Sequence, residues 1–248
     1  KSMGFKIEPL NVNTSGKVWE ISDDGKTLIQ PLTSIKGLGS SAMDQILEHR
    51  PFNKIEEFLF HDDVVYSKLN KKALDVLCQA GALSTLQDDR FTGEKHFWTC
   101  VAVDRPRKPQ NLIENIEKYA PEGDFSVEEK IESLTALTGV FPIRMIVSEE
   151  TQKNLMESGV PPISEFDKDL KITWFIPRKV MVRKTKNDKT YYVLEVVDSN
   201  NAITQIRCWG ANPEKDHVQV NRPYMAKLDY NDQWGFSTRS MYHNFRVL

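Results

Sequence analysis

The sequence has few cysteines, no long apolar run and no recognisable metal motif. Cys78, Cys100 and Cys208 fit neither a disulfide framework nor a CxxC metal site, and indicate a reducing, cytoplasmic compartment. No apolar run approaches the ~18 residues that a membrane-spanning helix needs. Residues 1–4 lack the apolar segment of a signal peptide. The histidines show neither HExxH nor HxH spacing, so we expect no metal ion in this chain.

Catalytic motifs are equally scarce. The sequence contains neither GxSxG nor GxxxxGK[ST]. Its adjacent carboxylate pairs, Asp62-Asp63, Asp88-Asp89 and Glu149-Glu150, are predicted to be caps and solvated charges rather than a two-metal site. We therefore expect no catalytic residue here.

The net charge of −2 hides an uneven distribution. Residues 171–248 carry 13 basic and 7 acidic side chains, whereas residues 110–170 carry 5 and 13, and residues 1–109 are balanced. A basic segment attracts a polyanion such as a phosphate backbone. The alternative is an ordinary solvated surface with fluctuating charge.

The most specific local pattern is Lys36-Gly37-Leu38-Gly39-Ser40-Ser41, directly before a helical segment. Glycine tolerates positive φ and lets another backbone approach closely. We predict Ser40 or Ser41 as N-cap, with the first amides of the helix pointing outward at the positive end of its dipole. A phosphate oxygen can accept hydrogen bonds from such amides. The alternative is a plain helix start that packs on a core and binds nothing.

A second helical unit, residues 68–83, supports this interpretation. Asn70 is the predicted N-cap of a helix that ends at Gly81. Lys71 and Lys72 occupy the first turn, where a cation opposes the helix dipole at a cost of up to ~1 kcal/mol. Lysines in this position are unfavourable for the helix but suit a site beside phosphate.

Other local signals outline the rest of the chain. Residues 18–21 and 27–29 are predicted to form a hairpin, and residues 92–111 a linker or exposed arm. Ser126 with Glu129 is typical of a capping box, and Ser148 is predicted to begin a further helix. From residue 170 the period becomes two, which predicts strands at 172–182, 191–197, 202–209 and 223–228 and a fifth from 236 onward. Five short strands suggest an OB-type barrel.

An OB fold binds single strands through a basic groove and flat aromatic rings. In residues 202–209, Ile206 and Cys208 share one face, so Arg207 and Trp209 share the other. If Ile206 and Cys208 lie in the core, Arg207 and Trp209 face outward and form a platform on which bases can stack. The alternative is that the aromatic residues fill the barrel. The predicted single-strand site comprises Arg183, Lys184, Lys186, Lys189, Tyr191, Arg207 and Trp209.

Several of these patterns together resemble bacterial family C replicative DNA polymerases, the alpha subunit of DNA polymerase III. The similarity rests on Ile35-Lys36-Gly37-Leu38-Gly39, Arg50-Pro51-Phe52, Leu69-Asn70-Lys71 and Gln79-Ala80-Gly81-Ala82-Leu83. The order of elements matches across most of the chain, although residues 92–170 match poorly. The resemblance implies an α+β fold, an all-α helix–hairpin–helix domain followed by a five-stranded OB-type β-barrel.

The resemblance also implies which domain of such a polymerase each segment would form. Residues 1–91 would be the end of the fingers and a tandem helix–hairpin–helix domain, residues 92–169 a helical linker region and residues 170–248 the OB domain. The palm, with its catalytic aspartates and Mg²⁺, would lie upstream of Lys1. Expected partners are primer–template duplex, single-stranded template and the remainder of the polymerase. A sliding clamp is a further expected partner, for which Gln110-Asn111-Leu112-Ile113 is the nearest candidate motif.

We therefore expect the DNA-holding, non-catalytic portion of such a polymerase. The duplex site would comprise Lys36, Gly37, Leu38, Gly39, Ser40, Ser41, Lys71 and Lys72. One alternative is a stand-alone scaffold whose OB fold binds a protein partner. Another is an OB domain that binds structured RNA.

Overall fold

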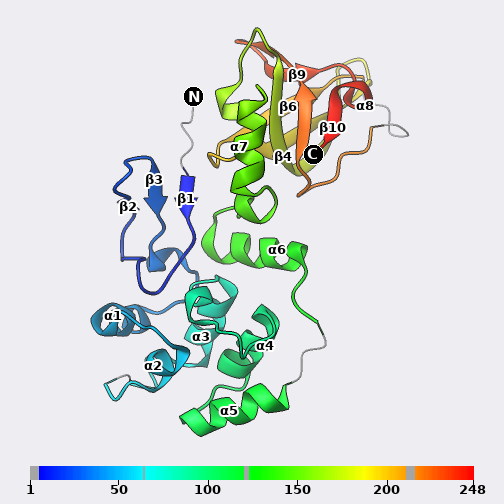
Figure 1. Ribbon diagram of the computed structural model, residues 1–248. Coiled ribbons are helices and arrows are strands. Elements are labelled where there is room, and N and C mark those ends of the chain that lie inside the picture. Colours follow the sequence, from blue (N-terminus) through cyan, green and yellow to red (C-terminus); the bar gives the residue numbers. More distant parts are fainter. Residues whose placement is uncertain (1–5, 64, 120–122, 211–215) are drawn as a thin grey trace. The chain divides into compact units, whose positions relative to one another are not determined.

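The structure, a computed structural model, describes residues 6–63, 65–119, 123–210 and 216–248. The chain divides into two compact units, one of residues 7–141 and one of residues 142–248 together with Lys6 (Figure 1). Within the described ranges, no helix combines the length and the apolar character needed to cross a membrane.

The unit of residues 7–141 begins with a small sheet and continues as helices. Strands β2 (Glu20–Ile21) and β3 (Thr27–Ile29) pair antiparallel, which confirms the predicted hairpin, and β1 (Lys6–Glu8) adds to β3. The remaining elements are η1 (Leu32–Ser34), α1 (Ser40–His49), α2 (Ile55–Phe60), α3 (Lys71–Gln79), η2 (Ser84–Leu86), α4 (Glu94–Trp98), the π-helical turn η3 (Thr99–Val103), α5 (Pro109–Lys118) and α6 (Val127–Thr138).

Helix α3 lies at the centre of this unit. It contacts α4, η3 and α6, and its Leu74 and Leu77 are fully buried (Figure 1). The expectation of an exposed arm at residues 92–111 is wrong, because most of this segment is helical and Phe97 and Cys100 belong to the core. The run of arginine and proline at residues 105–109 suggested an arm, whereas the apolar residues just before it form a buried face.

The capping signals that the sequence shows for α3 and α6 are confirmed. The side chain of Asn70 accepts a hydrogen bond from the Ala73 amide at 3.0 Å. Ser126 and Glu129 form both hydrogen bonds of the capping box, and α6 ends at Gly139 with a φ of 72°. These caps satisfy backbone groups that a helix terminus otherwise leaves unpaired. They fix where α3 and α6 begin.

The unit of residues 142–248 is built on one seven-stranded sheet, in the order β10-β7-β4-β5-β6-β9-β8. Its long strand β4 pairs with β7 through its first residues and with β5 through its later ones, with a register shift between Pro177 and Lys179. This lets the sheet curl into a half-barrel around Phe175, Leu194 and Ile206, all fully buried. The elements are η4 (Ile143–Met145), α7 (Glu149–Glu157), η5 (Ile163–Glu165), β4 (Ile172–Lys184), β5 (Thr190–Val197), β6 (Ile203–Cys208), β7 (Tyr224–Lys227), β8 (Asp229–Asn231), β9 (Gly235–Thr238), α8 (Met241–Asn244) and β10 (Phe245–Val247).

The sheet differs from the expected five-stranded closed barrel. Within the described residues it is open, with β10 and β8 at its edges. The five predicted strands correspond to β4, β5, β6, β7 and β9, whereas β8 and β10 were missed. Each of the two has three residues, too few to display a period of two. The predicted mixture of helices and a sheet is confirmed. The sheet is a seven-stranded half-barrel, whereas a five-stranded barrel was predicted.

Candidate nucleic-acid interface

The glycine bend of residues 36–41 is exposed and held in place by one buried side chain. Gly37 has a φ of +89°, in the left-handed region that favours glycine. Leu38 is buried together with Ala42 and Ile46 of α1, as the sequence pattern predicted. The other residues of the bend, Lys36, Gly37, Gly39, Ser40 and Ser41, are exposed.

Several amide groups of this bend are open at the start of α1, although those of Lys36 and Leu38 are paired. The N-cap is Gly39 and not Ser40 or Ser41, which are the first two helical residues, and no side chain caps the helix. The prediction failed because Gly39 is already extended, with a φ of −73° and a ψ of 150°, so the helix begins one residue earlier. In the part of the chain that the structure describes, the amides of Gly37, Gly39, Ser40 and Ser41 have no hydrogen-bond acceptor.

The second predicted unit meets this bend. A Cβ built at Gly37 would lie 3.5 Å from Cε of Lys72 and 3.6 Å from Cγ1 of Val76, so the lysine side chain passes over the glycine. Lys72 is exposed, in the first turn of α3. The structure therefore brings a cation next to a row of open amides. Both are donors that suit an anion.

Lys71, the other lysine of that turn, lies near Asp104. The hydroxyl of Tyr119 and the ammonium of Lys118 hold the pKa of Asp104 below its usual range, and the charge of Lys71 adds to this effect. Lys71 is exposed, so its charge is available at the surface. Lys72 thus lies beside Gly37, whereas Lys71 lies near Asp104.

The back of the bend is tied to the end of α6. The amide of Lys36 donates to the carbonyl of Leu137 at 2.9 Å, and the side-chain amide of Gln30 donates to the carbonyl of Thr138 at 3.4 Å. Sequence reasoning missed this support, because no local pattern marks a contact between such distant segments.

An exposed aromatic residue near α3 was also missed. Tyr66 is 46% exposed, and the guanidinium carbon of Arg105 lies 3.5 Å from the centroid of its ring. Arg105 also donates to the Tyr66 carbonyl at 2.8 Å, and Arg107 approaches the ring at 6.0 Å. Burial lowers the pKa of Arg105. The Arg105-Pro106-Arg107 run was the available signal for a cationic surface here.

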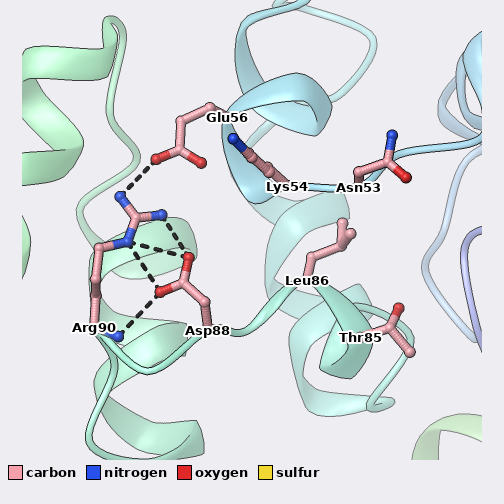
Figure 2. A pocket seen from close by; sticks show the side chains of 7 residues that line it. All are labelled: Asn53, Lys54, Glu56, Thr85, Leu86, Asp88 and Arg90. Atoms are coloured by element: carbon pink, nitrogen blue, oxygen red, sulfur yellow. Dashed lines mark hydrogen bonds and ion pairs between the residues drawn. The ribbon is translucent and has the colours of Figure 1, made fainter.

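A hollow of about 660 Å³ on the same unit is lined in part by an ion-pair network (Figure 2). Arg90 donates to Glu56 at 2.7 Å and to Asp88 at 2.6 Å. The hydrogen bonds from Arg90 hold the pKa values of Glu56 and Asp88 below their usual range. Because both carboxylates neutralise the guanidinium, Arg90 clamps α2 to the segment after η2 rather than offering a site for an anion.

On the half-barrel, predicted single-strand residues lie in a row across three strands. Arg183 of β4 is the register partner of Tyr191 of β5. The ring of Tyr191 stacks on that of Trp209, with 4.6 Å between centroids and 28° between planes. The pair presents two stacked rings, and Arg183 is the cross-strand neighbour of one of them.

The predicted alternation of β6 is confirmed. Ile206 and Cys208 are buried, at 0% and 1% exposure, and Arg207 and Trp209 are half-buried on the opposite face. Arg207 donates to the carbonyl of Trp234. At the end of β4 and in the turn that follows it, Arg183, Lys184, Lys186 and Lys189 are exposed, and Lys184 pairs with Asp188 at 2.8 Å.

Comparison with known proteins agrees with the geometry of the bend. The family described as "Helix-hairpin-helix motif" matches residues 4–93. The chain is 36% identical to the DNA polymerase III subunit alpha of Pseudomonas aeruginosa over 109 residues, covering 42% of this chain and 9% of that protein. The same subunit of Chlamydia muridarum is 29% identical over 93 residues, covering 36% of this chain and 7% of that protein.

The N-terminal region is a helix–hairpin–helix region like that of DNA polymerase III alpha subunits. The subunit of Thermotoga maritima, 28% identical over 90 residues, covers 36% of this chain and 10% of its own length. The chain thus spans a tenth or less of the length of these relatives. The helix–hairpin–helix match covers the Lys36–Ser41 bend and the start of α3, where Lys72 meets Gly37.

Proposed function

We propose that the helix–hairpin–helix region holds duplex DNA by its phosphate backbone, as the non-catalytic part of a DNA-directed DNA polymerase. The observation that carries this proposal is the row of open amides at Gly37, Gly39, Ser40 and Ser41 beside Lys72. A phosphate oxygen accepts from such amides at the positive end of a helix, and the lysine adds charge. The contacts read no base, so binding would be independent of sequence.

We further propose that the half-barrel guides single-stranded template. Support comes from the stacked rings of Tyr191 and Trp209, and from Arg183 as the cross-strand partner of Tyr191. A base can stack on the open face of such a pair, at ~1–3 kcal/mol per base. The exposed cations of the β4–β5 turn would follow the backbone of the strand.

In a polymerase of this kind, the chemistry and its Mg²⁺ would come from outside this chain, and the remainder of the enzyme would be its partner. The segment Gln110–Ile113 gives little support for a sliding-clamp contact. It lies in α5, and its Leu112 is fully buried in the core. A leucine in this position is unavailable to a partner without unfolding.

Duplex binding is tested by its salt dependence. Each phosphate contact contributes about 0.9 to the slope of log affinity against log salt, so replacing Lys71 and Lys72 together by glutamine should lower the slope by about 2. Fluorescence anisotropy of a labelled duplex gives the slope. The control is Lys95→Gln, which removes an exposed lysine of α4. An unchanged slope in the double variant, or a flat slope for the native chain, would refute the duplex proposal.

Single-strand binding is tested at the aromatic pair. Trp209→Ala should weaken binding of an oligothymidine by about 5–150-fold, the equivalent of one lost stacking contact. The control is Tyr242→Ala, which removes an aromatic side chain of α8 that is 60% exposed. Equal affinities of the native chain and the Trp209 variant would exclude the platform. Binding of a protein partner without any DNA shift would favour a scaffold instead.

A further inference from the structure

Three metal-ligating side chains gather outside the proposed DNA contacts. One ligand atom from each of His49, His61 and Asp63 lies within 4.8 Å of the other two. His49 is the last residue of α1, and the other two follow the end of α2. The rings of His49 and His61 meet edge to face, with 5.1 Å between centroids. Nδ1 of His61 lies 3.9 Å from a carboxylate oxygen of Asp63.

The His49 ring supplies a second, independent observation. Its side chain is only 9% exposed, and its Nδ1 has no hydrogen-bond partner within the described residues. The nearest carboxylate oxygen, on Glu48, is 4.0 Å away. Buried ring nitrogens in native proteins are normally paired, so an unpaired one calls for an explanation. Nδ1 is one of the two ring nitrogens through which His49 can hold an ion, and an ion bound there would be the partner that this atom lacks.

We propose that His49, His61 and Asp63 bind a divalent transition-metal ion, with Zn²⁺ as the best fit. Two imidazoles and one carboxylate are typical Zn²⁺ ligands, with water completing the shell. Mg²⁺ and Ca²⁺ prefer oxygen ligands alone, so the two histidines select against them. Glu48 adds negative charge near the site, which favours any cation.

Binding requires a modest closure of the cluster. Metal bonds of 2.0–2.2 Å place tetrahedral ligand atoms about 3.4 Å apart, and the ligand atoms of the cluster lie within 4.8 Å of one another, so it has to contract by at most about 1.4 Å. The side chains of His61 and Asp63 are 42% and 79% exposed, which leaves both free to rotate. If His61 binds the ion through Nδ1, the ion replaces the 3.3 Å hydrogen bond that the Asp63 amide donates to this nitrogen, because one lone pair cannot serve both.

The ion would fasten the end of α1 to the segment that leads into α3. One such fastening exists already, because the amide of Val65 donates to the buried side chain of Gln45 on α1 at 2.6 Å. The segment continues to Asn70, the N-cap of α3. The metal would therefore brace the connection between the two helical units. This proposal is independent of the proposed DNA binding.

The test uses the full chain without an affinity tag, titrated with Co²⁺ and then with Zn²⁺. We expect one Co²⁺ per chain, with visible absorption bands that Zn²⁺ removes. His61→Ala and Asp63→Asn should each weaken binding by ten-fold or more, since loss of an outer-shell partner alone costs about 10–100-fold. The control is His243→Ala, which removes an exposed histidine of α8 and should leave the affinity unchanged.

Unfolding supplies a second measurement. Zn²⁺ should raise the denaturant midpoint of the native chain and of the His243 variant, but not that of the His61 and Asp63 variants. Both of these positions are exposed, so the variants should fold, which circular dichroism checks. Absence of Co²⁺ bands in the native chain would overturn the proposal. Equal Co²⁺ binding by the native chain and the His61 and Asp63 variants would also overturn it, because it means adventitious binding only.

Discussion

The two glycines of the bend at residues 36–41 should respond differently to the same substitution. Gly37 has a φ of +89°, whereas Gly39 has a φ of −73°. An alanine at 37 would lie 3.5 Å from Lys72 and 3.6 Å from Val76, which is ordinary contact, so any cost comes from the backbone. Left-handed backbone costs a residue with a Cβ about 1–2 kcal/mol. We expect Gly37→Ala to lower the free energy of unfolding by that amount.

Gly39→Ala is the matched control. Nothing lies within 4 Å of a Cβ at this position. Alanine is a poorer N-cap than glycine, but it reduces the entropy of the unfolded chain by about 0.4–1 kcal/mol, and the two effects offset each other. We expect a change within about 0.5 kcal/mol.

Denaturant unfolding followed by the helical circular-dichroism signal separates the two variants. This signal arises mainly from residues 7–141, which contain α1 to α6. Equal losses for the two variants would refute the reasoning, as would a neutral Gly37→Ala. Either result would mean that the backbone at Gly37 does not adopt the left-handed conformation on which the exposed amides depend.

Two further predictions concern charge and burial. Arg90→Ala should cost about 1 kcal/mol at pH 7 in denaturant unfolding, since exposed ion pairs are worth little. Because the folded pKa values of Glu56 and Asp88 are lowered, the stabilisation is present above their unfolded values near pH 4 and is lost as the pH falls further, so the variant and the native chain should converge in acid. A difference that persists in acid would exclude this cause. Burial raises the pKa of Cys100 to about 11 and of Cys208 to about 12, so neither thiol should react with a disulfide reagent at pH 7 until the chain is denatured. Rapid labelling of the folded chain would contradict this.

Local chemistry explains what the sequence could predict. The caps at Asn70, Ser126 and Ser148 are side-chain hydrogen bonds to amides three residues ahead, so the pattern lies within a few positions. The alternation of β6 is equally local. The prediction of Ser40 as N-cap was wrong. Serine is a favourable N-cap residue, but it lies one position after Gly39, whose backbone is already extended.

Features that depend on distant partners could not be predicted. Strand β10 exists because Phe245, Arg246 and Val247 pair with β7, and its own residues show no period. The cluster of His49 with His61 and Asp63 forms because the turn after α2 returns to the end of α1. Their spacing matches no familiar metal motif. The segment of α4 and η3 was predicted to be an exposed arm because a run of charged residues follows it. Its own short apolar face is nevertheless buried in the core.

The Lys36 amide donates to the Leu137 carbonyl. The conformation of the bend therefore depends on a segment that is synthesised much later than the bend itself. Closing a loop of about a hundred residues is entropically costly and slow, so the conformation of the bend would form late in folding. A truncated peptide that ends before α6 would keep the glycines and lysines but lose the carbonyl that anchors the bend from behind. The hairpin is thus not an autonomous module, and its shape belongs to the whole helical unit.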